Sequence, residues 1–155
     1  IKTISEQIPD AIVGAGTVTT AEHISAVLEV GGQFMVSPGI TDTLIEAAMR
    51  QEVILLPGIA TPSEAMKLID YGIHHMKFFP AEAAGGIPML KSMRGPFPQL
   101  SFCPTGGLTP ASAKDYLALP NVTCVGGSWM VPQNLIEAGD WDAIELLARE
   151  AAASY

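Results

Sequence analysis

The chain has 155 residues, of which 48% are hydrophobic, so it can bury one sizeable core and is expected to form a single domain over residues 1–155. Eight lysines and arginines against sixteen aspartates and glutamates give a formal net charge of −8. Without any local basic cluster, this balance argues against a nucleic-acid surface and against binding to an anionic membrane.

Six short apolar runs, each closed by glycine or proline, predict buried parallel strands. They cover residues 11–18, 33–39, 53–59, 74–80, 101–107 and 122–128. Helical periodicity fills the segments between them, and several of these begin at a threonine suited to the N-cap position, namely Thr20, Thr41, Thr61 and Thr109. Residues 140–154 predict a closing amphipathic helix whose apolar face holds Trp141, Ile144, Leu147 and Ala148.

Alternating strands and helices predict an α/β fold, either a doubly wound sheet or a barrel. Residues 14–19 lack the third glycine of a dinucleotide-binding fingerprint, and polar residues or glycines close every run, which favours a (β/α)8 TIM barrel. Such a barrel needs eight strands and commonly binds phosphate after strands seven and eight. We therefore expect strands three to eight here, with the first two βα units missing and residues 1–8 as the tail of the second helix.

Lys77 lies within an apolar run that should be a buried strand. Burial removes hydration from an ammonium and lowers its pKa, so neutral amine becomes available near neutral pH. A neutral amine attacks ketones, and the protonated imine stabilises the carbanion left when a carbon–carbon bond breaks. The alternative is a strand-end lysine whose amine extends into solvent.

Two Gly-Gly loops, residues 105–107 and 126–128, follow consecutive predicted strands. Glycine lets main-chain amides approach an anion closely, and the helix expected after Thr109 adds a favourable dipole end. The pair predicts a shared phosphate site, although tight turns at strand ends would explain either loop alone.

The remaining polar residues suggest no metal or cofactor site. His74 and His75 point to opposite faces of a strand and cannot chelate one ion together, while Cys103 and Cys124 fit no disulfide or zinc spacing and read as buried small hydrophobes. Glu82 follows Lys77 closely enough to shuttle protons, but a capping or salt-bridge role is the simpler interpretation.

Five strings of residues, 13–18, 37–39, 77–82, 103–107 and 126–129, together resemble the 2-keto-3-deoxy-6-phosphogluconate / 4-hydroxy-2-oxoglutarate aldolase family. The Lys-Phe-Phe-Pro-Ala-Glu string at 77–82 is the most specific of them. The resemblance implies cleavage of the phosphorylated keto acid to pyruvate and glyceraldehyde 3-phosphate by a cytoplasmic homotrimer, without metal or organic cofactor. The unphosphorylated 4-hydroxy-2-oxoglutarate is a second possible substrate.

Site residues follow from the same resemblance. Lys77 would form the Schiff base and Phe79 would pack beside the imine. The pyruvate portion would contact Thr17, Thr105 and Pro38. The phosphate would rest on Gly106, Gly107, Gly127 and Ser128.

Two features of the family, a general acid/base glutamate on an early strand and an arginine after it, belong to the region expected to be missing. If residues 1–155 were the whole polypeptide, we would expect an open barrel of low stability and weak catalysis, because proton transfer typically contributes about 10²- to 10⁴-fold. Two alternatives stay open. One is another phosphate-binding barrel enzyme, such as a sugar-phosphate epimerase or a thiamine-phosphate synthase, and the other is a non-catalytic metabolite-binding subunit.

Overall fold

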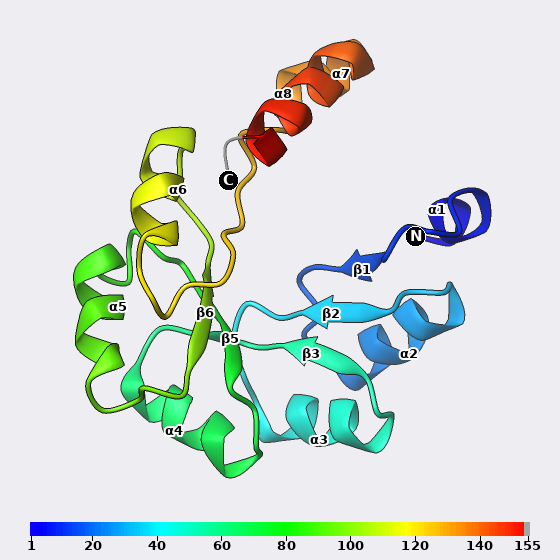
Figure 1. Ribbon diagram of the computed structural model, residues 1–155. Helices are drawn as coiled ribbons and strands as arrows, with labels where there is room; N and C mark the ends of the chain where they lie inside the picture. The colour runs from blue at the N-terminus through cyan, green and yellow to red at the C-terminus, as the bar shows by residue number, and fades with distance from the viewer. Residues whose placement is uncertain (154–155) are drawn as a thin grey trace.

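The computed structural model describes residues 1–153, in which short parallel strands alternate with helices (Figure 1). The strands are β1 (Gly14–Ala15), β2 (Phe34–Val36), β3 (Ile54–Leu56), β4 (Gly58–Ile59), β5 (His75–Phe78) and β6 (Ser101–Pro104). The helices are α1 (Lys2–Gln7), α2 (Ala21–Glu29), α3 (Asp42–Arg50), α4 (Pro62–Asp70), α5 (Gly86–Arg94), α6 (Pro110–Leu117), α7 (Gln133–Ala138) and α8 (Trp141–Ala153). The predicted α/β alternation is confirmed.

The strands form two parallel sheets of three, in the orders β1-β2-β3 and β4-β5-β6. The predicted third strand, residues 53–59, is divided between them, because Pro57 lacks the N–H that a continuous ladder needs. The Pro57 carbonyl still accepts a hydrogen bond from the Lys77 amide at 2.8 Å, which keeps the second sheet attached across the break. Within residues 1–153 the strands therefore form two parallel sheets that are joined at a proline.

The predicted sixth strand, residues 122–128, is also corrected. Two isolated parallel bridges, Phe102 to Val122 and Thr105 to Gly126, are all that this segment forms. The two bridges are three residues apart along Phe102–Thr105 but four apart along Val122–Gly126. The second segment therefore carries one extra residue, which interrupts the ladder. The segment nevertheless runs beside β6 and brings its glycines to the same end of the sheet.

Helices cover one face of these sheets, and two apolar clusters fill the space between the layers (Figure 1). The larger cluster joins β5 and β6 to α4, α5 and α6, and the smaller one joins β2 to α2 and α3. All four predicted threonine N-caps are confirmed, since each side chain accepts a hydrogen bond from the amide three residues later. The caps fix where each helix starts, and so they fix the length of the loop at each strand end.

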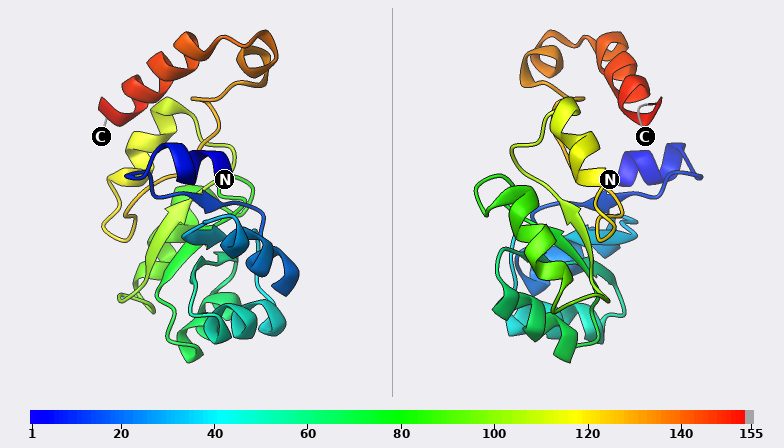
Figure 2. Two further views of the ribbon diagram at one scale, coloured as in Figure 1. Left: turned by 90° about the vertical axis from the view of Figure 1, so that its right-hand side faces the viewer. Right: turned by 60° about the vertical axis from the view of Figure 1, so that its left-hand side comes forward.

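α7 and most of α8 project from the rest of the chain (Figure 2), and the end of α8, at Ala151 and Ala152, borders a cavity that Leu117 of α6 also lines. α8 confirms the predicted terminal helix, whose residue 154 lies outside the described residues, but none of its residues is buried, and Trp141 is 63% exposed. The predicted apolar face of this helix is therefore not buried in the core. No helix within residues 1–153 is long and apolar enough to cross a membrane.

Candidate active site

Lys77 lies on the face of β5 that points away from the helices. Its neighbours Met76 and Phe78 are both fully buried in the larger apolar cluster, and side chains alternate along a strand, so the Lys77 side chain must leave on the opposite side. The amine is half-buried, and this desolvation lowers its pKa, against a smaller opposing effect from Cys103. The strand thus presents a partly desolvated amine on its helix-free face.

Phe79 places an aromatic ring directly beside this amine, with Nζ of Lys77 4.2 Å from the ring centroid. Gly106 also lies against this ring, since an added Cβ there would lie 3.2 Å from Phe79 Cδ2. Gly106 has a φ of +100°, which a glycine adopts without strain. The Phe79 ring therefore contacts both the Lys77 amine and the first Gly-Gly loop.

Thr105 continues this group on the neighbouring strand. β5 and β6 pair in register, with Lys77 opposite Cys103, and the Thr105 amide donates to the Phe78 carbonyl at 2.9 Å. The Thr105 hydroxyl donates to the Cys103 carbonyl at 3.3 Å. Gly126 lies against the same side chain, because a Cβ there would be 2.6 Å from Thr105 Oγ1.

The two Gly-Gly loops face one cavity of about 300 Å³. Its lining consists of Thr105, Gly106, Gly107, Leu108, Gly126, Gly127 and Ser128. The close approach of the second loop depends on Gly127, whose Cα faces the Trp129 ring so closely that any Cβ would overlap it. The two predicted loops thus line a single hollow.

Pro38 and Thr17 follow β2 and β1, at the same end of the strands as Lys77. Gly58 lies between Pro38 and Lys77. The Pro38 carbonyl packs on Gly58, and Gly58 is the register partner of Lys77. Thr17 has a left-handed φ of 58°, which is uncommon for a residue other than glycine. Within residues 1–153 no hydrogen bond joins the Thr17 side chain to Lys77, Phe79 or Thr105.

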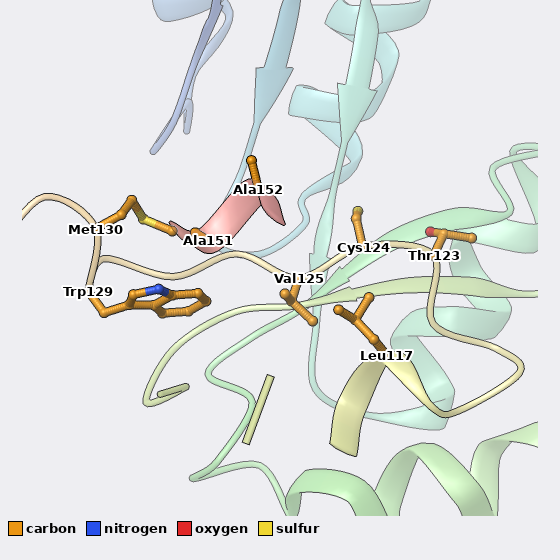
Figure 3. Close-up of a pocket in the computed structure, with 8 residues that line it drawn as sticks. All are labelled: Leu117, Thr123, Cys124, Val125, Trp129, Met130, Ala151 and Ala152. Atoms are coloured by element: carbon orange, nitrogen blue, oxygen red, sulfur yellow. The ribbon is translucent and has the colours of Figure 1, made fainter. Parts of the chain in front are cut away.

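A pair of thiols beside Lys77 was missed by the sequence analysis. Cys124 is exposed rather than buried, and its hydrogen bond with Cys103 lowers the pKa of Cys124 to about 6 and raises that of Cys103. A signal was available: each cysteine is the third residue of its predicted strand, and those strands are consecutive. Cys124 also lines an apolar cavity of about 330 Å³, together with Trp129 and Leu117 (Figure 3).

The other candidate polar residues lie outside this chemistry. Glu82 accepts a hydrogen bond from the Tyr116 hydroxyl at 2.8 Å, and no ion pair joins it to Lys77 in the described part of the chain. Among residues 1–153 no three His, Cys, Asp or Glu side chains gather as a metal site would require. The arrangement therefore offers one amine, one aromatic ring and main-chain amides.

Known proteins are similar in sequence to this chain over nearly its whole length. The family described as KDPG and KHG aldolase matches residues 1–147. The chain is 53% identical to a KHG/KDPG aldolase of Escherichia coli over 151 residues, which are 97% of this chain and 71% of that protein. It is 51% identical to a 2-dehydro-3-deoxy-phosphogluconate aldolase of Pseudoalteromonas atlantica over 153 residues, 99% of this chain and 71% of the relative.

Solved structures agree with these matches. The KDPG aldolase of Legionella pneumophila, with pyruvate captured as a covalent carbinolamine, superposes with a TM-score of 0.91 at 47% identity, covering 94% of this chain and 71% of that one. The enzyme of Zymomonas mobilis with 3-phosphoglycerate also reaches a TM-score of 0.91, at 48% identity, covering 100% and 72%. Neither a different barrel enzyme nor a non-catalytic subunit is favoured by these similarities.

Proposed function

We infer the function from one premise: the chain belongs to the KDPG and KHG aldolase family, and is thus a class I aldolase, a carbon–carbon lyase that acts through a Schiff base. We propose that it cleaves 2-keto-3-deoxy-6-phosphogluconate to pyruvate and glyceraldehyde 3-phosphate, with Lys77 as the Schiff-base amine. The observation that carries this proposal is the half-buried Lys77 amine of lowered pKa, in contact with Phe79 at a strand end.

The first step adds the neutral Lys77 amine to the keto carbon and forms a carbinolamine, which loses water to give the imine. Cleavage of the bond between carbons 3 and 4 sends its electron pair into the protonated imine, while the hydroxyl on carbon 4 loses its proton and becomes the aldehyde of glyceraldehyde 3-phosphate. The resulting enamine takes up a proton at carbon 3, and hydrolysis of the pyruvate imine restores the amine.

Substrate contacts follow the strand ends. We propose that Phe79 flanks the imine and that Thr105, Thr17 and Pro38 contact the pyruvate portion. The phosphate would lie in the cavity of the two Gly-Gly loops, on the amides of Gly106, Gly107, Gly127 and Ser128. Support comes from the shared cavity and from the Zymomonas mobilis relative, whose structure contains 3-phosphoglycerate.

A second substrate, 4-hydroxy-2-oxoglutarate, is supported by the KHG/KDPG aldolase of Escherichia coli. Its cleavage by the same imine would give pyruvate and glyoxylate. We further propose that residues 1–155 form one domain corresponding to strands three to eight of a TIM barrel, and that the enzyme is a cytoplasmic homotrimer. Light scattering coupled to size-exclusion chromatography tests the trimer.

The central test is covalent trapping. The chain is incubated with pyruvate, reduced with borohydride and digested, and mass spectrometry locates the adduct. We expect the adduct on Lys77, none in Lys77→Arg, and undiminished labelling in Lys91→Arg, which changes an exposed lysine on α5. An unlabelled wild-type chain, or a label on another lysine, would exclude the proposed mechanism.

A further inference from the structure

Main-chain hydrogen bonds join the loop after Lys77 to the first Gly-Gly loop. The Ala81 amide donates to the Thr105 carbonyl at 2.8 Å, and the Glu82 amide donates to the Gly106 carbonyl at 3.2 Å. The segment that follows the lysine strand is thus held against the segment that we assign to phosphate. Any displacement of Glu82 would move the glycines with it.

The Glu82 side chain packs directly on Gly107. A Cβ at Gly107 would lie 2.8 Å from Cγ and 2.9 Å from Cβ of Glu82, so a glycine is needed for the two loops to come this close. Gly107 also has a φ of +82°, which disfavours other residues. The aliphatic part of Glu82 therefore forms a support beneath the peptide of Gly107.

Tyr116 fixes the far end of the same side chain. Its ring lies in the larger apolar cluster, only 1% exposed, and its hydroxyl donates to Glu82 Oε1 at 2.8 Å. Burial, followed by the bond to Glu82, raises the pKa of Tyr116, so the hydroxyl stays protonated and remains a donor. Tyr116 belongs to α6, the helix that begins directly after the first Gly-Gly loop. The hydrogen bond therefore joins the segment after Lys77 to the helix that follows the first Gly-Gly loop.

We propose that Glu82 and Tyr116 are a positioning pair, which holds the amides of Gly106 and Gly107 in the geometry that binds the substrate phosphate. This inference rests on the proposed function, because the phosphate is assigned to these loops there. The pair transfers no proton. The hydrogen bond from Tyr116 fixes the Glu82 carboxylate against α6, and the aliphatic part of Glu82 packs on Gly107 and so supports the first Gly-Gly loop. The relevant property of Glu82 is an acceptor oxygen at the end of its side chain, and not its charge.

The test measures the dissociation constant of inorganic phosphate by ³¹P NMR titration of the full chain. Tyr116→Phe and Glu82→Ala each remove the hydrogen bond and should raise the constant about fivefold, which corresponds to about 1 kcal/mol. Glu82→Gln keeps an acceptor oxygen, so its dissociation constant for phosphate should stay within about twofold of the wild-type value. If Tyr116→Phe does not fold, the two exposed Glu82 variants decide the question alone.

A matched control is Tyr71→Phe, since the Tyr71 hydroxyl also donates to a carboxylate, that of Asp42, at 3.1 Å but on the exposed helix surface. This control should leave phosphate binding unchanged. The inference is overturned if the wild type binds no phosphate, if Glu82→Gln loses as much as Glu82→Ala, or if Tyr71→Phe and Tyr116→Phe behave alike. Borohydride trapping at Lys77 should be equal in all variants, so a failure of the imine chemistry would be recognised separately.

Discussion

Replacing Gly58 by alanine tests how tightly the lysine strand is fixed to its neighbours. Gly58 lies in β4 as the register partner of Lys77, and its amide donates to the Ser37 hydroxyl oxygen at 3.4 Å. An added Cβ would lie 2.4 Å from both the carbonyl carbon and oxygen of Pro38. Since these are main-chain atoms, no side-chain rotation relieves the overlap, and β4 must move away from the loop after β2.

The expected loss of stability is at the upper end of the range for overpacked cores, about 3 kcal/mol. For a chain of this length each kcal/mol lowers the melting temperature by roughly 2–4 °C, so Gly58→Ala should melt about 6–12 °C below the wild type. Because Gly58 pairs with Lys77, borohydride trapping of pyruvate should also be slower.

Thermal denaturation followed by circular dichroism measures the shift. The matched control is Gly95→Ala, at the end of α5, where an added Cβ meets no atom within 4 Å and φ is −61°. That substitution should be neutral or stabilise by about 0.4–1 kcal/mol, because alanine restricts the unfolded chain. Equal melting temperatures for Gly58→Ala and the wild type would refute the steric argument.

Three further predictions concern separate groups. Trapping of pyruvate on Lys77 should reach half of its maximal rate at a pH below about 10.4, the pKa of an ordinary lysine, because burial favours the neutral amine. Trapping rates measured across pH test this, and a midpoint at or above that pKa would contradict it. Iodoacetamide should alkylate Cys124 before Cys103, with a midpoint near pH 6 in mass-spectrometric rates, and equal labelling would argue against the shared hydrogen bond. Thr61→Ala removes the capping box with Glu64 and should lower stability by about 1 kcal/mol in urea denaturation, whereas an unchanged midpoint would show that the cap adds nothing.

Local signals in the sequence predicted the elements well, because they depend on neighbouring residues only. Each threonine cap starts its helix where expected, and apolar runs mark the strands. The pairing of strands was harder, since it depends on groups far apart in the chain. Residues 53–59 were predicted as one strand, although the missing N–H of Pro57 divides it between two sheets.

The site shows the same division. Lys77 was identifiable because a charged residue in an apolar run is conspicuous, and its face follows from alternation along β5. The bond between Glu82 and Tyr116 spans 34 residues and joins a loop to a helix, so no periodicity reveals it. Cys124 was taken as buried because cysteine is usually buried, whereas its environment depends on where residues 122–128 lie beside β6.

The cavity formed by the Gly-Gly loops has a thermodynamic consequence, since four of its seven lining residues are glycines. A side chain that a ligand immobilises costs about 0.5–1.5 kcal/mol in lost rotamers, but a glycine has no rotamers to lose. A guest in this hollow would therefore restrict little of the protein and would lose mainly its own freedom of motion. Substitutions of nearby side chains should change such binding less than substitutions that move the peptide groups themselves.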